Sequence, residues 1–313
     1  MRVLGELSIQ ASTQASVRSS TVNTGELDLN VLEIGDPNGL PVICVHGLRD
    51  TAHALIPALT WEGSRFRFLL PELRGHGLSD QTDAFAMPNF LQDVLSVAEH
   101  FKLDKFALFG HSLGGHVTSK FAALWPERVT ALVIVEGLGP PRRPHEGDPE
   151  LELQAYRFML ENRLAYKAPK AMPNLDDAAK RLLRNNPRLN ASEAERLVPF
   201  LTKPVNEGLV WSFDNRAASV FIGQTAIENQ KFWNAVQAPT CVIAGTLSYE
   251  YWGREMQSTG FTGKFAEGEM EARAAHFKHH EFHWFDHSGH MVHYDEPERL
   301  SQVTRTFLEK QHV

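Results

Sequence analysis

A serine flanked by glycines stands in the first half of the chain, in the run Gly110-His111-Ser112-Leu113-Gly114-Gly115. It follows an apolar run at 106–109 that favours a buried strand, and a helical pattern comes next. Glycines at this spacing permit a tight strand-to-helix turn, in which the backbone leaves no room for a Cβ atom. Such a turn exposes the hydroxyl beside helix amides that favour negative charge. We therefore predict that Ser112 is a nucleophile; the alternative is a glycine-rich connector that happens to contain a serine.

A histidine is the expected partner, because a serine hydroxyl is a poor nucleophile until a nearby base removes its proton. Among the 15 histidines, we predict His290, which lies between the last expected strand and the terminal helix. A metal site is the alternative for this region, since histidines are dense there. At strand spacing Glu281 and His283 share a face while the others scatter, which argues against a coherent ligand cluster. The histidines in question are His276, His279, His280, His283, His287, His290 and His293.

Two glutamates compete to be the acid that orients the imidazole and stabilises its charged form. Glu136 directly follows the apolar run at 132–135, whereas Glu250 lies in the loop after the run at 241–244. Both loops would open at the carboxyl edge of a doubly wound sheet, so topology permits either residue. We favour Glu136, because a strand end is a more rigid support than a longer loop. The other role open to Glu136 is a local hydrogen bond at the start of the inserted segment.

Backbone donors for an oxyanion are expected in the loop that begins His46-Gly47-Leu48, after the apolar run at 42–45. An anionic tetrahedral intermediate needs hydrogen-bond donors, and the N–H groups of Leu48 and Leu113 can point at one oxygen. Glycine at position 47 lets the chain approach closely. The alternative is a plain turn that ends a strand.

These residues can meet only if a sheet brings distant segments together. The clearest helix, Asn89–Phe101, repeats apolar residues at helical spacing, and a last strand around Glu281–Phe285 precedes a terminal helix at Pro297–Lys310. The alternation of apolar runs with helices predicts an α/β fold with a mostly parallel, doubly wound sheet. Five runs have the length and composition of its buried strands: Val42–Val45, Phe66–Leu70, Phe106–Phe109, Leu132–Val135 and Cys241–Ala244.

The alternation stops at Gly139–Pro149, a stretch dense in proline and glycine. From about Leu151 to Phe232 the pattern is helical and charged, with no convincing strand, as in Leu175–Asn185 and Ser192–Leu201. We therefore predict an inserted helical cap at 139–235, between two parts of the core domain at 1–138 and 236–313. Large apolar side chains of the cap are expected mostly to pack against the sheet domain and in part to line an acyl pocket: Tyr156, Phe158, Met159, Phe200, Trp211, Phe213, Phe221 and Phe232.

The composition of the 313 residues narrows the class of partner. Lys and Arg total 31 against 38 Asp and Glu, which gives a formal net charge of −7. The composition therefore lacks the excess of basic residues that is typical of nucleic-acid-binding proteins. No apolar stretch of about 18 residues is present to span a membrane. The two cysteines, Cys44 and Cys241, lie inside apolar runs, which argues against a disulfide scaffold or a cysteine zinc cluster. We expect a cytoplasmic protein, monomeric or a small homo-oligomer, that acts on a small molecule without a cofactor or metal.

Several motifs resemble the α/β-hydrolase superfamily in order and spacing across most of the chain: His46-Gly47, the segment Pro71–Asp80, Gly110–Gly115 and Gly289-His290. Others resemble the serine hydrolase-like group within it: His46–Asp50, Arg181–Asn186, and Gly208-Leu209-Val210 with Asp214 and Arg216. The resemblance implies a carboxylesterase-type serine hydrolase with a helical cap.

The resemblance also helps to choose between the two glutamates as the acid that orients the histidine. Most members of the superfamily place it a few residues after the strand that corresponds to 241–244, where this chain has Ser248. A subset places it after the preceding strand, and Glu136 matches that placement. Glu250 stays open as the alternative acid.

The expected reaction is hydrolysis of a carboxylic ester through an acyl-enzyme on Ser112, His290 and Glu136. A lactone or a thioester is an alternative substrate that no motif separates from an ester. Less favoured alternatives are a non-hydrolytic reaction on the same fold and a binding protein with weak or no catalysis.

Overall fold

The architecture comes from a computed structural model, which describes residues 17–142, 147–164, 169–222, 224, 226–256 and 261–311. Segment 1–16, for which the sequence indicates no role, lies outside the described residues. In the described part, none of the helices combines the length and the apolar content that crossing a bilayer requires.

An eight-stranded sheet forms the centre of the molecule, in the order β1-β2-β4-β3-β5-β6-β9-β10. The strand β2 is antiparallel to both of its neighbours, and every other pairing is parallel. The strands are β1 (Arg18–Asn23), β2 (Asp28–Gly35), β3 (Leu40–Val45), β4 (Phe66–Pro71), β5 (Phe106–His111), β6 (Val129–Val135), β9 (Thr240–Gly245) and β10 (His280–Phe285).

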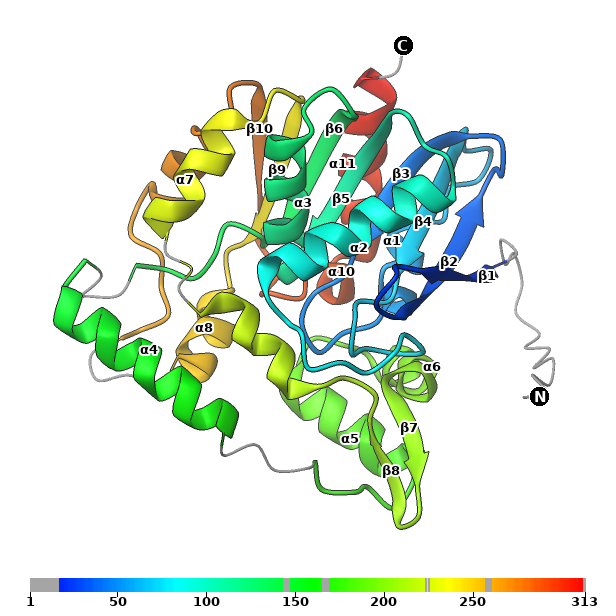
Figure 1. The fold of residues 1–313 in the computed structure, drawn as a ribbon, viewed down its shortest axis with the longest axis vertical. Helices are drawn as coiled ribbons and strands as arrows, with labels where there is room; N and C mark the ends of the chain where they lie inside the picture. The colour runs from blue at the N-terminus through cyan, green and yellow to red at the C-terminus, as the bar shows by residue number, and fades with distance from the viewer. Residues whose placement is uncertain are drawn as a thin grey trace.

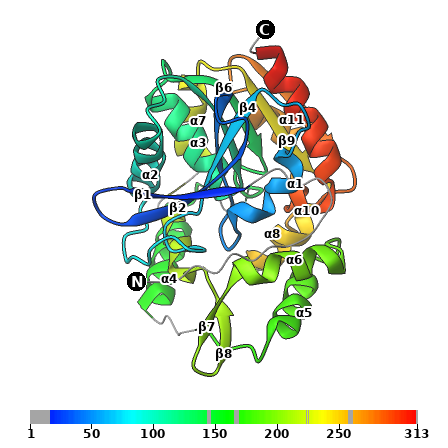
Figure 2. The same cartoon turned by 90° about the vertical axis from the view of Figure 1, so that its right-hand side faces the viewer.

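Helices cover both faces of this sheet (Figures 1 and 2). One face carries α2 (Met87–His100), α3 (Leu113–Leu124) and α7 (Ala226–Ala235); the other carries α1 (Ile56–Leu59) and α11 (Pro297–Gln311). The alternation of side chains along each strand explains the two layers, because neighbouring residues point to opposite faces. In β3, Ile43 and Val45 belong to the core under α2 and α3, whereas Val42 and Cys44 belong to the core under α11.

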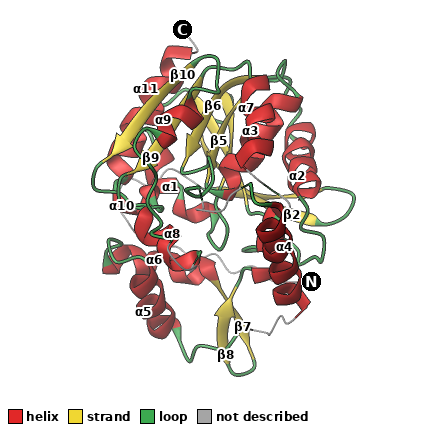
Figure 3. Ribbon diagram, turned by 90° about the vertical axis from the view of Figure 1, so that its left-hand side faces the viewer, coloured by secondary structure: helices red, strands yellow, loops and turns green. Residues whose placement is uncertain are grey.

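A second group of elements lies beyond the carboxyl edge of the sheet (Figures 1 and 3). The predicted absence of strands from this region is wrong, because β7 and β8 form an antiparallel hairpin. Each strand has only four residues and β7 contains Pro204, so neither gives a clear alternating pattern. The group comprises α4 (Pro149–Leu164), α5 (Leu175–Asn185), α6 (Ala191–Leu201), β7 (Thr202–Val205), β8 (Gly208–Trp211) and α8 (Tyr249–Glu255).

The division of the chain at 138 and 235 stays a prediction. The helix α7 falls within the predicted cap, yet it packs against α3, and its Trp233 is buried in the core of the sheet domain. Short elements complete the fold: η1 (Ala52–Ala54), η2 (Asn215–Phe221), α9 (Glu269–Ala274) and α10 (Val292–Asp295).

The predicted doubly wound α/β fold is confirmed, and so are the five buried strands, the long helix near residue 90, the last strand and the terminal helix. The chain runs from β3 outward to β4 and then returns to β5 on the other side of β3. Loops after β3 and β5 therefore diverge at the carboxyl edge, the place where sheets of this kind bind ligands. The cysteines Cys44 and Cys241 are buried free thiols in β3 and β9.

We expect Gly114→Ala to lower the free energy of unfolding by about 3 kcal/mol, because backbone atoms block the new methyl group. A Cβ atom at Gly114 would overlap the carbonyl oxygen of Val45. The matched control is Gly253→Ala in α8, where a Cβ atom would lie 3.4 Å from the carbonyl oxygen of Thr262. We expect this control to gain about 0.5 kcal/mol of helix propensity. Urea unfolding of both variants measures the difference, and equal stabilities would contradict the packing described for the turn.

Candidate active site

Ser112 stands at the turn between β5 and α3 with φ 51° and ψ −115°, a conformation that non-glycine residues rarely adopt. Glycines on either side make this turn possible, as the spacing predicts. A Cβ atom at Gly110 would overlap the carbonyl oxygen of Gly114 and the hydroxyl of Thr118. The strain holds the serine side chain at the carboxyl edge of the sheet.

Positive φ angles recur along this edge. Among the described residues, four that are not glycine have positive φ: Arg49, Lys102, Ser112 and Glu136. Three of them follow β3, β5 and β6, the central parallel strands. Each such conformation costs on the order of 1–3 kcal/mol, and such strain gathers at functional sites.

The structure brings Ser112, His290 and Glu136 together in one chain of hydrogen bonds. His290 Nε2 lies 2.9 Å from Ser112 Oγ, and His290 Nδ1 lies 3.0 Å from Glu136 Oε2. Glu136 and His290 are each 3% exposed. Because a carboxylate only accepts, Nδ1 carries the proton of the imidazole and leaves Nε2 free to accept from the serine hydroxyl.

The second oxygen of Glu136 is also bound. Its Oε1 accepts from the N–H of Gly245 at 2.7 Å and from the hydroxyl of Ser248 at 2.6 Å. Both donors come from the end of β9 and the residues after it. Ser248 therefore stands where the resemblance would place an acid, and it donates to the acid that follows the neighbouring strand instead.

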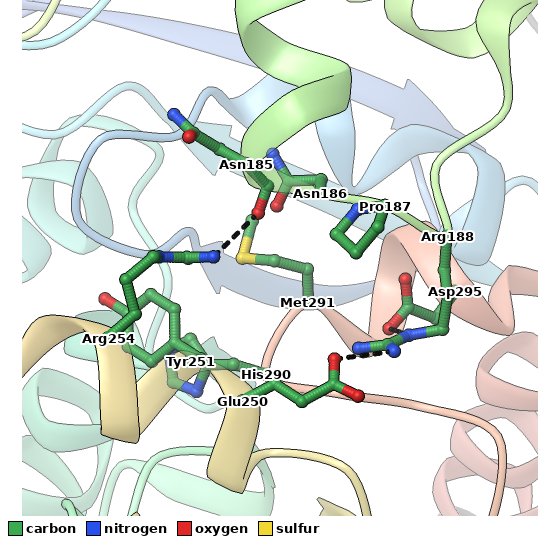
Figure 4. A pocket seen from close by; sticks show the side chains of 10 residues that line it. All are labelled: Asn185, Asn186, Pro187, Arg188, Glu250, Tyr251, Arg254, His290, Met291 and Asp295. Carbon is green, nitrogen blue, oxygen red and sulfur yellow. Dashed lines mark hydrogen bonds and ion pairs between the residues drawn. The ribbon is translucent and has the colours of Figure 1, made fainter.

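Glu250 does not contact His290. The segment expected to be a long loop is the helix α8, and Glu250 on it accepts from Arg188 Nη1 at 2.8 Å (Figure 4). The Nε of Arg188 also donates to Asp295 at 3.0 Å. Glu250 thus belongs to an ion-pair group at the rim of the site.

Two aromatic rings of α8 pack against His290, and sequence reasoning missed both. The ring of Tyr251 stacks on the imidazole with centroids 4.0 Å apart and planes 13° apart, and Trp252 meets it edge-on at 4.9 Å. Burial raises the pKa of Tyr251 to about 12, so it remains a neutral phenol. A π-face against His290 stabilises the imidazolium form. The three aromatic residues in the run Tyr249-Glu250-Tyr251-Trp252 are the sequence feature that could have indicated this packing.

The predicted backbone donors lie close to Ser112. A Cβ atom at Gly47 would lie 3.2 Å from Ser112 Cβ and 2.7 Å from His111 Nδ1, so only glycine lets this loop come so near. Leu113 is the first residue of α3, whose initial N–H groups have no partner within the helix. In the described part of the chain, neither the N–H of Leu48 nor that of Leu113 forms a hydrogen bond.

A buried polar network beneath the site was not foreseen. His111 Nε2 donates to the backbone carbonyl of His290 at 2.8 Å. Asp50 accepts from His293 Nε2 at 2.9 Å and from the Tyr294 hydroxyl at 2.7 Å. Asp50 follows β3 and His293 follows His290, so these bonds connect the loop that contains Leu48 to the segment that contains His290.

Among the residues that the structure describes, two groups of side chains have three potential metal-binding atoms within 4.8 Å of one another. One is Asp50, His111 and His293, all buried; the other is Cys241, Glu281 and His283. The second group adds Cys241, on the adjacent strand, to the pair that sequence spacing places on one face. In both groups a histidine already hydrogen-bonds the carboxylate.

The site opens into a pocket of about 50 Å³ that is walled by His290, Tyr251 and Met291 and by Asn185 and Asn186 of the inserted segment (Figure 4). The carbonyl of Asn185 accepts from Arg254 Nη1 at 3.3 Å, which connects the end of α5 to α8. The space has room for little more than one or two waters.

Burial keeps several histidines around the site uncharged at neutral pH. The pKa of His53 and that of His76 are each lowered to about 4, in both cases mainly because burial disfavours the charged ring. Burial also lowers the pKa of His111 and that of His116 well below the ordinary value.

Comparison with known proteins agrees with the fold. A family model described as alpha/beta hydrolase fold matches residues 41–297. The chain therefore belongs to the α/β-hydrolase family.

Within that family the chain is similar to proteins of the serine hydrolase-like group, the group that its motifs resemble. It is similar to "Serine hydrolase-like protein 2" of Homo sapiens, with 27% identity over 89% of this chain and 90% of the human protein. "Serine hydrolase-like protein" of Danio rerio is 29% identical over 58% of this chain, and the match spans 57% of the fish protein. A solved structure, "Thioesterase Domain From Curacin Biosynthetic Pathway", superposes with a TM-score of 0.76 over 93% of this chain and 99% of the domain at 19% identity. This similarity concerns the fold alone.

We expect the free energy of unfolding to fall steeply as the pH drops from about 6.5 to 4. In this window the unfolded chain protonates the four histidines around the site at the ordinary pKa, whereas the folded chain keeps the rings of lowered pKa neutral, so acid favours unfolding. Each ring whose pKa is lowered by burial adds a slope of about 1.4 kcal/mol per pH unit. His116→Gln should reduce the slope by one such contribution, while His100→Gln, which removes an exposed ring, should not. Urea titrations at several pH values measure the slopes, and equal slopes for the two variants would count against this account.

Proposed function

We propose that the chain is a serine hydrolase that cleaves carboxylic esters through an acyl-enzyme. The observation that carries the proposal is the continuous set of hydrogen bonds from Ser112 through His290 to Glu136. A strained nucleophile, a base within reach and a buried acid that orients the base are the three parts that such chemistry requires.

In the first half of the proposed reaction, Ser112 Oγ attacks the ester carbonyl as His290 Nε2 takes the hydroxyl proton. The carbonyl oxygen becomes an anion, for which the N–H groups of Leu48 and Leu113 are the proposed donors. His290 then gives its proton to the departing alkoxide, and the acyl group remains on Ser112. Water repeats the sequence in the second half and releases the acid.

Glu136 has the role of holding the imidazole with its proton on Nδ1 and of balancing the charge that His290 gains. Its own position is set by the amide of Gly245 and the hydroxyl of Ser248. Tyr251, stacked on His290, supports the charged ring from one side. The inserted segment 139–235 is proposed as the cap that shapes the substrate pocket.

Ser112→Ala is expected to abolish hydrolysis of p-nitrophenyl esters, with a loss of at least about 10³-fold in kcat, because the acyl-enzyme cannot form. The unfolding transition should remain that of the wild-type protein. A fluorophosphonate probe should label the wild type and not the variant, since labelling needs an activated serine. Unchanged turnover in the variant, or a wild-type protein that the probe does not label, would contradict the proposal. Absence of labelling would favour a binding role.

Glu136→Gln is expected to reduce kcat by about 10⁴-fold, because an amide at this position favours the wrong tautomer of His290. Glu250→Gln is the matched control: it makes the same chemical change to a carboxylate at the rim, which pairs with Arg188. We expect the control to keep kcat within a few-fold of the wild type. If the control is the variant that loses activity, the assignment of the acid is wrong.

A further inference from the structure

A second pocket lies on the inserted segment beside the one that His290 lines. It has a volume of about 470 Å³, and its walls are Lys170, Arg181, Arg184, Asn185 and Trp211. We call it the cation pocket, because three of these side chains are positively charged and none of the described residues that line it is a carboxylate. Its size falls within the range of pockets that hold small ligands.

In the part of the chain that the structure describes, no ion pair balances the two arginines of this pocket. Among the described residues, neither Arg181 nor Arg184 forms an ion pair, although most of the other arginines do. Asp177 precedes Arg181 by four residues in α5, the spacing at which helical ion pairs form, and yet the two do not pair. The chain as a whole has more acids than bases, 38 against 31. Two like charges one helical turn apart repel each other, and an external anion would relieve that repulsion.

The fifth wall is an aromatic surface. The ring of Trp211 stacks on that of Phe213 with centroids 5.8 Å apart and planes 12° apart, so the indole is held in one orientation. Trp211 is only partly buried and lines the pocket. A fixed, accessible indole is a platform for a flat ring such as a nucleobase. Guanidinium groups nearby bind phosphate with two parallel hydrogen bonds each.

The two pockets share Asn185, at the end of α5. The pocket beside His290 holds only about 50 Å³, whereas the cation pocket holds about 470 Å³. A substrate that reacts beside His290 therefore has space for its larger part on the side of the cation pocket. Three positive charges match the two or more negative charges of a diphosphate better than the single charge of a carboxylate.

We propose that the cation pocket binds the phosphate groups of the leaving group, with its nucleobase on Trp211, so that the substrate is an acyl thioester of a phosphorylated nucleotide carrier. This inference rests on the acyl-enzyme chemistry of the proposed function and makes the substrate a thioester rather than an oxygen ester. The thioester carbonyl accepts Ser112 Oγ, the C–S bond breaks, and the thiolate takes its proton from His290. Water then cleaves the acyl–serine ester and yields a carboxylic acid, so no further reactant is needed.

The kinetic test compares two thioesters with the same acyl group. Butyryl-coenzyme A carries the phosphates and the base, whereas butyryl-N-acetylcysteamine carries neither. We expect the wild type to favour the first by at least about 100-fold in kcat/KM, about 10-fold for each of the two guanidinium groups. The double variant Arg181→Gln/Arg184→Gln should lose most of that ratio through a higher KM. Lys180→Gln, which removes an exposed charge of α5 that does not line the pocket, should keep it.

A binding test separates this inference from the proposed function. Calorimetry with ADP uses the Ser112→Ala protein, in which no turnover takes place. Saturable ADP binding that the arginine double variant loses supports binding of the phosphates in the cation pocket. Weaker binding of pyrophosphate than of ADP supports stacking of the nucleobase on Trp211. Absence of ADP binding, or a kcat/KM ratio near one in the wild type, would overturn the inference even if p-nitrophenyl esters are still hydrolysed. Retained ADP binding in a protein without any serine-dependent hydrolysis would instead overturn the proposed function.

Discussion

The site depends on backbone packing against backbone at the carboxyl edge of the sheet. A Cβ atom at Gly115 would lie 2.6 Å from the Cα atom of Gly137, and one at Gly114 would overlap the carbonyl of Val45. These contacts bring α3 directly against the loops that follow β3 and β6. Because no side chain separates the layers, Ser112 and Glu136 are held at strained angles that neither would adopt alone. The free energy for that strain comes from the buried sheet, whose central strands are covered on both faces.

The position of the acid follows from the same packing. Glu136 follows β6 with φ 52°, and its carboxylate reaches across the edge to Gly245 at the end of β9. A carboxylate a few residues after β9 would need that space, and there the chain has Ser248 instead, which donates to Glu136. One carboxylate oxygen is thus left for His290 while the other is fully used. A side chain with both oxygens committed in this way cannot rotate, so the imidazole it binds has one orientation.

Sequence patterns predicted the parts of this arrangement that depend on short-range rules. The elbow around Ser112, the strand that ends at Glu136 and the loop that carries His290 each follow from local composition, and the structure brings them together. Glu250 was a competitor because parallel strands open their loops at one edge, and only the fold of α8 turns it toward Arg188. The stacking of Tyr251 on His290 and the bond between Asp50 and His293 join residues far apart in the chain. No periodicity encodes such pairs, just as none revealed the four-residue strands β7 and β8.

Charge is distributed unequally between the pocket that His290 lines and the cation pocket. This difference would orient a bound molecule. Near His290 the guanidinium of Arg188 is neutralised by Glu250 and Asp295, so this side of α5 presents closed ion pairs. In the last turn of α5, Arg184 has no such partner in the described part of the chain. A closed ion pair attracts an anion weakly, whereas an unpaired guanidinium attracts it over a distance set by the ionic strength. Under the proposed function, an acyl compound with a charged end would therefore enter with its neutral end toward Ser112, the direction that the proposed acyl transfer requires.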